Sequence, residues 1–259
     1  MTLQRLFFAL SLTLCLCLPC AAKAAQRIVS LDLCTDWMLA RHAEPSQVAA
    51  LSPMHRRYPA PWLTKTWPFH DGRLERILEI NPDLIITGQY NALQLRARLK
   101  TLGFRVEILP LPTHLAGIHD YETRLLSLIG QPVSRAHPPP GDPPPQSATR
   151  RRLLLLGANG IGTGQGTFEN GILLQAGWQN YLLGERHLRL DLEQIMQDPP
   201  EAILWAAPPN RALANRFAEH PALKRVIPPE HWLSTDYWRW QCPGPWTWEL
   251  IEQLKQWHD

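Results

Sequence analysis

The sequence predicts an α/β protein of two similar lobes, each a mostly parallel sheet flanked by helices, with one interlobe connection. Three observations lead to this prediction. A helix-strand motif occurs twice, the predicted strands are apolar runs without alternation, and a run of prolines separates the two copies. Apolar strands that do not alternate are typical of parallel sheets covered by helices on both faces.

The repeated motif is a Leu-Glu-x-x-Ile helix followed by a proline, an acidic residue and a buried strand. Its copies cover residues 74–86 and 192–204, an offset of 118 residues. In each copy the proline ends the helix and the apolar residues behind it form the strand. Equivalent positions are Glu75 and Glu193, Ile77 and Ile195, Pro82 and Pro200, and Ile85 and Ile203. A second pair of strands, 27–31 and 152–156, opens the two lobes about 125 residues apart.

The first 24 residues have the composition of a secretory signal peptide. Arg5 provides a positive start, residues 6–18 form a short apolar segment, and residues 22–24 fit a cleavage site. The segment is too short for a membrane-spanning helix, so we expect a mature chain exported to the periplasm. Its removal takes away two basic residues and no acid, which lowers the formal charge from +3 to +1. A charge near zero predicts neither a nucleic-acid partner nor a membrane-surface partner.

Removal of this leader also leaves only two cysteines, Cys34 and Cys242. In an exported protein such a pair favours one disulfide. The alternative is two unrelated buried thiols, because a sequence does not give the Cα separation that a disulfide requires.

The domain boundaries follow from these elements. With 259 residues, 45% of them hydrophobic and 19% charged, the chain is long enough for two lobes of roughly 100 residues each. We predict an N-terminal lobe over 25–115, an interlobe segment over 116–150 and a C-terminal lobe over 151–259. The interlobe segment begins as a helix over 117–134. Six prolines among residues 138–145 then exclude a helix and indicate a stiff or disordered linker.

A search for catalytic chemistry finds no motif. The sequence contains no HExxH, GxSxG or Walker lysine motif, and its ten histidines form no tight cluster with acids. The glycine-rich stretch 157–166 precedes a helix capped by Thr167, but its glycines miss the dinucleotide-binding register. We expect its backbone to approach a ligand or the other lobe closely. No catalytic residue, metal ligand or resident cofactor is predicted.

Aromatic residues follow the ends of predicted strands and show no helical period. In open α/β sheets the ligand lies beyond the carboxyl ends of the strands, and aromatic side chains there suit a large, flat, partly apolar ligand. Packing between the lobes is the alternative for about half of them, because tryptophan is highly buried on average. The predicted ligand-binding residues are Tyr58, Trp67, Gln89, Tyr90, Trp205, Tyr237, Trp238 and Trp240.

The order and spacing of these segments resemble the solute-binding proteins of ABC importers for cobalamin and iron-siderophores. The resemblance covers the mature chain and is carried by residues 27–31, 74–86, 102–106, 157–176 and 192–204. It implies a monomeric periplasmic protein that performs no chemistry, binds a corrinoid, a ferric siderophore or haem, and delivers it to a permease. It places the family's two permease-docking glutamates at Glu75 and Glu193. The alternative for each is a first-turn acid favoured by the helix dipole.

Two departures from the family pattern matter. The proline run replaces much of the long helix that normally joins the lobes. The usual reason for a rigid orientation of the two lobes is then absent. Cys34 falls at the cleft edge of the first lobe and Cys242 in a cleft loop of the second. A bond between them would close a loop of about 200 residues and stabilise the fold by roughly 4–5 kcal/mol. The competing interpretation is that both thiols face the ligand.

Two other functions remain open at this point. A metal-ion receptor of an ABC importer would bind zinc or manganese through histidines and carboxylates. An exported α/β enzyme would use the glycine-rich loop, although the lack of a nucleophile–base motif argues against it.

Overall fold

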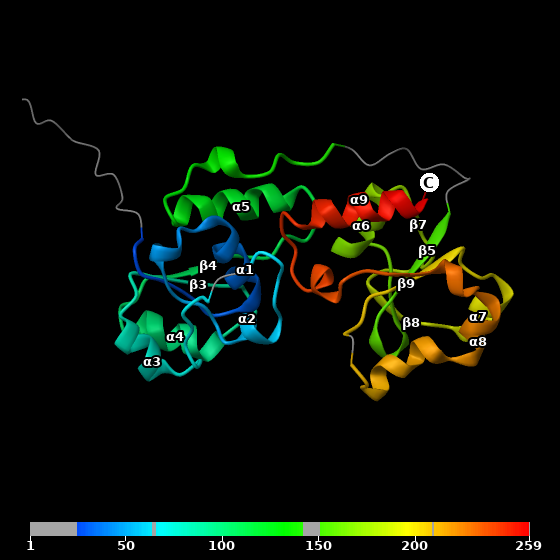
Figure 1. Ribbon diagram of the computed structural model, residues 1–259, viewed down its shortest axis with the longest axis horizontal. Coiled ribbons are helices and arrows are strands. Elements are labelled where there is room, and N and C mark those ends of the chain that lie inside the picture. Colours follow the sequence, from blue (N-terminus) through cyan, green and yellow to red (C-terminus); the bar gives the residue numbers. More distant parts are fainter. Residues whose placement is uncertain (1–24, 64–65, 142–150, 209, 259) are drawn as a thin grey trace, which may run out of the picture.

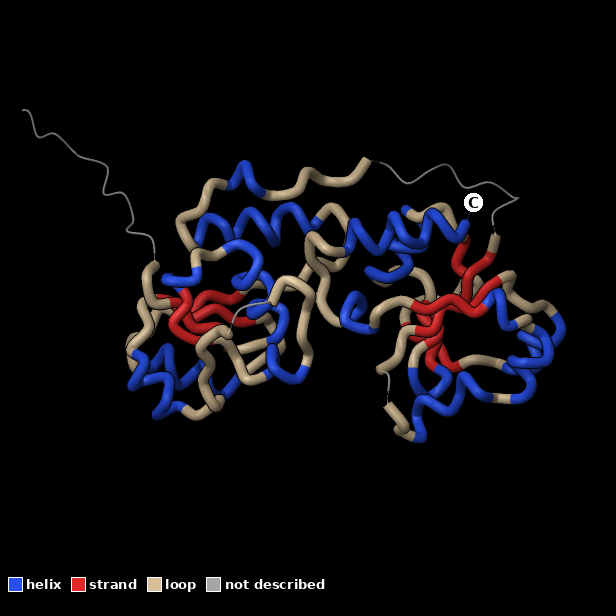
Figure 2. Tube along the Cα trace, in the orientation of Figure 1, coloured by secondary structure: helices blue, strands red, loops and turns tan. Residues whose placement is uncertain are grey.

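The computed structural model describes residues 25–63, 66–141, 151–208 and 210–258. The predicted signal peptide and most of the predicted proline-rich linker lie outside the described residues. The described chain forms two lobes side by side, each with strands inside and helices outside (Figures 1 and 2). Within the described part of the chain, no helix is long and apolar enough to cross a membrane.

The N-terminal lobe is built on a sheet of four parallel strands in the order β2-β1-β3-β4. Helices α1 and α5 (Gly117–Leu128) cover one face of this sheet, and α3 and α4 cover the other. Both faces of β1 and β3 are therefore buried, as their unalternating apolar sequences predict. The elements are β1 (Ile28–Ser30), α1 (Leu33–His42), β2 (Val48–Ala50), α2 (Met54–Arg57), α3 (Leu74–Ile80), β3 (Leu84–Thr87), α4 (Leu93–Thr101) and β4 (Val106–Ile108).

The C-terminal lobe has a mixed sheet in the order β10-β9-β5-β6-β8, with β7 paired to β5. Strands β7 and β9 run parallel to β5, and β10 runs parallel to β9, whereas β6 is antiparallel to both β5 and β8. Helices α6 and α9 cover one face, and α7 and α8 cover the other. The strands are β5 (Arg152–Leu156), β6 (Ile161–Thr163), β7 (Gln179–Asn180), β8 (His187–Arg189), β9 (Ala202–Trp205) and β10 (Trp232–Ser234). The helices are α6 (Phe168–Gln175), α7 (Leu192–Gln197), α8 (Pro221–Val226) and α9 (Thr247–His258).

The predicted repeat is present in three dimensions. Helices α3 and α7 each place one isoleucine, Ile77 or Ile195, in the core. The strands that follow pair in the same way, since Ile85 lies opposite Val29 and Ile203 lies opposite Leu154. The acid after the proline also has one role in both copies. Asp83 accepts a hydrogen bond from the backbone N–H of Arg27, and Glu201 accepts one from that of Arg152.

The glycine-rich stretch folds differently from the expectation. Residues 157–164 form a short 3-10 turn and β6, which folds back antiparallel to β5. Its backbone approaches the C-terminal lobe itself, because a Cβ atom on Gly164 would lie 2.1 Å from the carbonyl oxygen of Gly184. The expected close approach to a ligand or to the other lobe is therefore wrong for this glycine. Thr167 caps α6 as predicted, accepting from the Asn170 N–H at 3.1 Å.

Helix α5 (Gly117–Leu128) is shorter than the predicted helix over 117–134. It ends because Gly130 adopts a left-handed φ of 72° and Pro132 follows, so the helical ladder stops there. The chain then runs back along α5 (Figure 1). Helix α5 spans the junction of the lobes, since Ile118 packs in the C-terminal core and Leu125 packs in the N-terminal core.

A buried carboxylate fixes the returning segment. Glu122 on α5 is fully buried, and its Oε1 lies 3.0 Å from His42 Nε2 and 3.0 Å from His137 Nδ1. Its Oε2 accepts from the His137 backbone N–H at 2.7 Å. Burial acts to raise the pKa of Glu122, but the interactions with His42 and His137 outweigh it and hold that pKa below its usual value. The ionised carboxylate thus joins α1, α5 and the segment behind α5.

Candidate functional site

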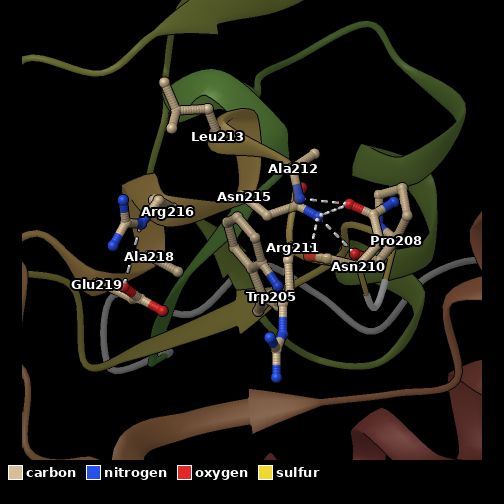
Figure 3. Close-up of a pocket in the computed structure, with 10 residues that line it drawn as sticks. All are labelled: Trp205, Pro208, Asn210, Arg211, Ala212, Leu213, Asn215, Arg216, Ala218 and Glu219. Atoms are coloured by element: carbon tan, nitrogen blue, oxygen red, sulfur yellow. Dashed lines mark hydrogen bonds and ion pairs between the residues drawn. The ribbon is translucent and has the colours of Figure 1, made fainter.

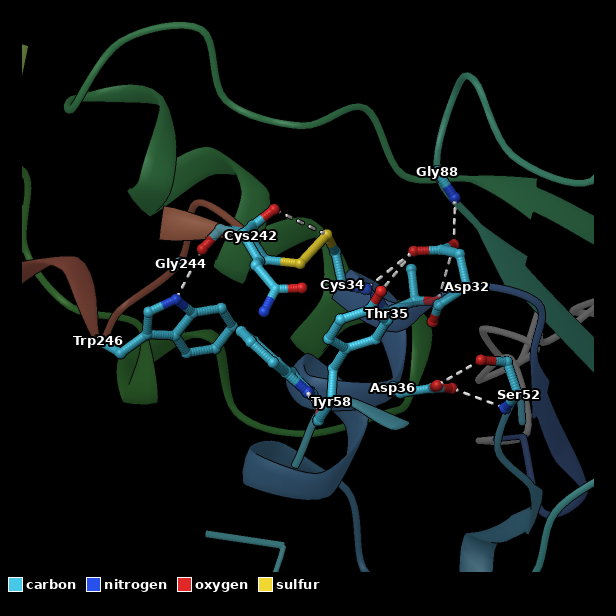
Figure 4. Close-up of a disulfide and its surroundings, with 12 residues drawn as sticks. Asp32, Cys34, Thr35, Asp36, Ser52, Tyr58, Gly88, Cys242, Gly244 and Trp246 are labelled. Atoms are coloured by element: carbon cyan, nitrogen blue, oxygen red, sulfur yellow. Dashed lines mark hydrogen bonds between the residues drawn. A yellow bond between two sulfur atoms is a disulfide. The ribbon is translucent and has the colours of Figure 1, made fainter. Parts of the chain in front are cut away.

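Loops at the carboxyl ends of strands meet where the two lobes join. The loops after β1 and β2 of the N-terminal lobe contact the segment after β10 of the C-terminal lobe. The most direct link is a disulfide between Cys34, in the first turn of α1, and Cys242, with a Cα separation of 5.4 Å (Figure 4). The predicted bond is therefore confirmed. Both cysteines are buried and bonded, so neither presents a free thiol to a ligand.

Four tryptophans surround this disulfide and continue the N-terminal core into the other lobe. The rings of Trp62 and Trp246 are stacked, with centroids 4.8 Å apart and an interplanar angle of 25°. Trp37 contacts both of these rings edge-on, and Trp238 contacts Trp62 and Trp37 edge-on. Trp246 is fully buried and its Nε1–H donates to the Cys242 carbonyl at 2.7 Å. The segment before α9 therefore crosses back and completes the N-terminal core.

Buried polar groups hold the N-terminal loops in place. Asp36 on α1 is fully buried and accepts from the Ser52 N–H at 2.8 Å and from the Ser52 hydroxyl at 2.5 Å (Figure 4). Burial raises the pKa of Asp36 well above its usual value. His70 lies 2.8 Å from the Ser30 carbonyl through Nε2 and accepts from the Gly72 N–H through Nδ1, while burial lowers its pKa. This pattern requires a neutral ring with its proton on Nε2.

The C-terminal lobe instead leaves space at its strand ends. A cavity of about 720 Å³ lies beside Trp205, the last residue of β9, and is lined by ten residues between Trp205 and Glu219 (Figure 3). Asn215 Nδ2 donates to the carbonyls of Pro208 and Asn210, which fixes the back of this cavity. The side chains of Arg211 and Arg216 give it positive charge, partly balanced by Glu219, 3.9 Å from Arg216.

A second cavity of about 560 Å³ shares Trp205 with the first. It is mainly apolar and is bounded by Ile227, Trp232 and Leu233. The half-buried ring of Trp205 therefore borders two spaces whose combined size and lining suit a large ligand with an apolar body. Sequence reasoning identified Trp205 but missed Arg211 and Asn215, because the irregular segment after β9 has no periodic pattern.

Comparison with solved structures gives the architecture a context. A periplasmic haem-binding protein from Pseudomonas aeruginosa superposes with a TM-score of 0.65 at 17% identity, covering 90% of this chain and 92% of its own. A possible iron-binding, periplasmic solute-binding protein from Staphylococcus epidermidis gives 0.67 at 16% identity, covering 92% and 98%. The periplasmic vitamin B12-binding protein BtuF of Vibrio cholerae gives 0.62 at 20% identity, covering 90% and 96%.

The chain has the bilobal fold of periplasmic solute-binding proteins. By sequence, no protein-family model and no curated protein matches it. The fold expected from the resemblance is thus confirmed by structure at identities too low for sequence comparison to detect.

The structure places the predicted aromatic residues in different surroundings. Tyr58 and Tyr237 are half-buried neighbours at the junction, where burial and the nearby Tyr58 phenol raise the pKa of Tyr237. Trp238 belongs to the cluster around the disulfide, and Trp240 packs against the C-terminal core with its Nε1–H on the Thr235 hydroxyl at 2.6 Å. Trp67 is buried in the N-terminal core, 6% exposed.

Two other predicted residues lie in the loop after β3. The Gln89 side chain accepts from the Leu111 N–H at 2.7 Å, so it is engaged within its own lobe. Tyr90 is 78% exposed, which makes it the most open of the predicted aromatic side chains. The structure therefore leaves Tyr90 exposed, leaves Tyr58, Trp205 and Tyr237 half-buried, and uses Trp67 and Trp238 mainly in packing.

The two predicted docking glutamates occupy equivalent places. Glu75 and Glu193 are both exposed in the first turn of a helix, α3 or α7. These helices lie toward opposite ends of the long axis of the molecule (Figure 1). The two-lobed repeat thus presents one carboxylate near each end.

Metal binding has no matching geometry in the part of the chain that the structure describes. Among those residues, no group of three or more histidine, cysteine, aspartate or glutamate side chains is placed to hold a metal ion.

Proposed function

We propose that this chain is a periplasmic binding protein that captures a corrinoid or an iron chelate, a ferric siderophore or haem, between its lobes. It then delivers this ligand to an ABC import permease and performs no chemistry itself. The observation that carries the proposal is the pair of cavities that share Trp205 at the carboxyl end of β9, in a fold of two lobes linked by a disulfide. The fold supports it, since proteins of the same fold bind haem and vitamin B12.

The surroundings of the cavities fit such a ligand. Their volumes, about 720 and 560 Å³, are in the range of sites for large organic molecules. Trp205 offers an aromatic face for a macrocycle, and Arg211 and Asn215 offer polar anchors beside it. The exposed Tyr90 offers a second aromatic face from the N-terminal lobe. Binding by ring packing and a few hydrogen bonds needs no covalent step.

A fluorescence titration tests this proposal. Cyanocobalamin, haemin and a ferric hydroxamate siderophore are each added to the mature protein while tryptophan emission is followed. We expect saturable quenching by one of them, and a smaller amplitude with weaker affinity in Trp205→Phe. Trp257→Phe, on α9 and away from the cavities, is the matched control and keeps the wild-type affinity. No response to any of the three ligands overturns the proposal.

Glu75 and Glu193 are proposed as the contacts to the permease. Their equivalent positions suit two similar permease subunits, and an exposed carboxylate in a first helical turn is well placed to meet an arginine. Glu75→Arg or Glu193→Arg is expected to reduce ligand uptake in cells and leave ligand affinity unchanged. Glu252→Arg, an exposed acid on α9, is the matched control. A loss of affinity in the two test variants would instead place these residues in the ligand site.

A further inference from the structure

The loop after β3 presents Tyr90 but does not depend on that side chain for its own shape. Its backbone is held from inside the lobe at consecutive positions. The Gly88 N–H donates to Asp32 Oδ2 at 2.6 Å, and Arg96 Nη1 donates to the carbonyls of Gly88 and Gln89, both at 2.9 Å. An exposed tyrosine is thus mounted on a loop whose polar groups are satisfied by side chains behind it.

Arg96 reaches this loop from the helix that follows it. It lies in α4, the next element after the loop, and is only partly exposed. Ala92, between the loop and α4, has a left-handed φ of 49°, a conformation that alanine disfavours by about 1 kcal/mol. Two hydrogen bonds from a charged donor offset this cost and stabilise the loop in this conformation.

Asp32 connects the same loop to the junction of the lobes. The carboxylate is 4% exposed, and its Oδ1 accepts from the N–H groups of Cys34 and Thr35, which caps α1 (Figure 4). One carboxylate therefore fixes both the loop that carries Tyr90 and the helix turn that carries the interlobe disulfide.

We propose that Arg96 is a positioning residue of the ligand cleft. It touches no ligand and acts through the carbonyls of Gly88 and Gln89, which set the direction of Tyr90, while Asp32 ties this loop to the disulfide-bonded turn of α1. The proposal rests on the proposed function, because it gives Tyr90 a ligand to meet.

Hydrogen exchange of the full mature chain tests the positioning step without any ligand. In Arg96→Met, which keeps the aliphatic stem and removes the donors, the Gly88 amide and the segment 88–92 should exchange roughly tenfold faster. Arg98→Met, an exposed arginine on the same helix, is the matched control and leaves the segment unchanged. Arg96→Lys keeps a charged donor and should restore part of the protection. Unchanged exchange in Arg96→Met overturns the proposal whether or not a ligand has been found.

A double-mutant cycle then tests the link to binding. With haemin or cyanocobalamin, whichever quenches the wild type, Arg96→Met should weaken binding roughly tenfold in the wild type and less than about twofold in Tyr90→Ala. Equal losses in both backgrounds would show a general structural role and overturn the inference. If exchange responds and no probe binds the wild type, the ligand proposal fails and the positioning of the loop stands.

Discussion

The two lobes share one plan but differ in how they finish the carboxyl ends of their strands. In the N-terminal lobe, buried Asp32, Asp36 and His70 bind the loop backbones from inside. In the C-terminal lobe the segment after β9 forms a 3-10 helix, Leu213–Glu219, beside open cavities, and Leu213 is 80% exposed. One lobe is therefore preorganised, and the other supplies the space.

The physical basis of this contrast is the cost of leaving buried polar groups unpaired. Each buried carboxylate or imidazole in the N-terminal lobe holds its neighbours in one arrangement, because any other would strand a polar group away from water. The C-terminal segment has poorer 3-10 hydrogen bonds, and its polar contacts, such as those of Asn215, are only partly buried or exposed, so its side chains can adjust to a ligand at lower cost. A duplicated fold can thus divide rigidity and adaptability between its copies.

Trp246 gives the largest test of this contrast. It belongs to the C-terminal part of the sequence but is fully buried in the N-terminal core, stacked on Trp62. Trp246→Ala should lower the free energy of unfolding by about 3–5 kcal/mol, measured by chemical denaturation. A loss below about 1 kcal/mol would mean that this segment does not complete the N-terminal core.

The disulfide should have the next largest effect. It links residues 208 positions apart, so its removal frees a long loop in the unfolded chain. Cys34→Ala/Cys242→Ala should lose about 2–5 kcal/mol in denaturation without reductant. Reductant should lower the wild-type midpoint to that of the double variant and leave the double variant unchanged. Equal denaturation midpoints for the oxidised wild type and the double variant would contradict the predicted stabilisation by the disulfide.

Asp36 predicts a pH dependence that is specific to the rigid lobe. Burial raises the pKa of Asp36 in the folded state, so the protonated carboxyl group favours folding. Its contribution to the free energy of unfolding is fully present below the unfolded pKa of about 3.9. That stability is lost as the pH rises through the folded pKa.

Asp36→Asn does not titrate and can still pair with Ser52, so its stability relative to the wild type should increase as the pH rises from 4. Denaturation midpoints at several pH values measure this difference. Asp120→Asn, an exposed acid on α5, is the control and should follow the wild type. Parallel curves for Asp36→Asn and the wild type would contradict the burial of a raised-pKa carboxyl group.

The smallest effect on stability is expected at Trp205, which borders the cavities of the C-terminal lobe, whereas Trp246 is buried in the N-terminal core. The Trp205 ring is half-buried and borders the cavities, so Trp205→Ala should change the unfolding free energy by less than about 1 kcal/mol. The same variant should bind the ligand roughly tenfold more weakly. A stability loss equal to that of Trp246→Ala would place Trp205 in the core and remove the contrast.

Much of the fold could be predicted from local pattern. The apolar runs at β1, β3, β5 and β9 are buried strands, and the repeat around Ile77 and Ile195 folds as two equivalent units. The antiparallel pairing of β6 with β5 and β8 was not predictable, because the short segment 161–163 resembles a glycine-rich loop. Likewise, the end of α5 depended on the left-handed geometry of a single glycine, Gly130.

The candidate site was predictable as a list of residue types but not as an arrangement. The aromatic residues predicted after strands include Tyr90, which is exposed, and Trp205, which borders both cavities. Trp67 and Trp238 have the same sequence context, yet the structure packs them into the N-terminal core. No local signal separates these cases, since burial depends on contacts with residues far away in the chain.

By itself, the sequence determined the element types, the duplication and the two cysteines outside the leader. These follow from periodicity, spacing and composition. Only the tertiary structure decided that the segment 236–246 crosses back to the N-terminal lobe. It also decided that Asp32 joins the Tyr90 loop to α1 and that the cavities lie beside Trp205. These features depend on contacts between residues tens to hundreds of positions apart, which no local pattern records.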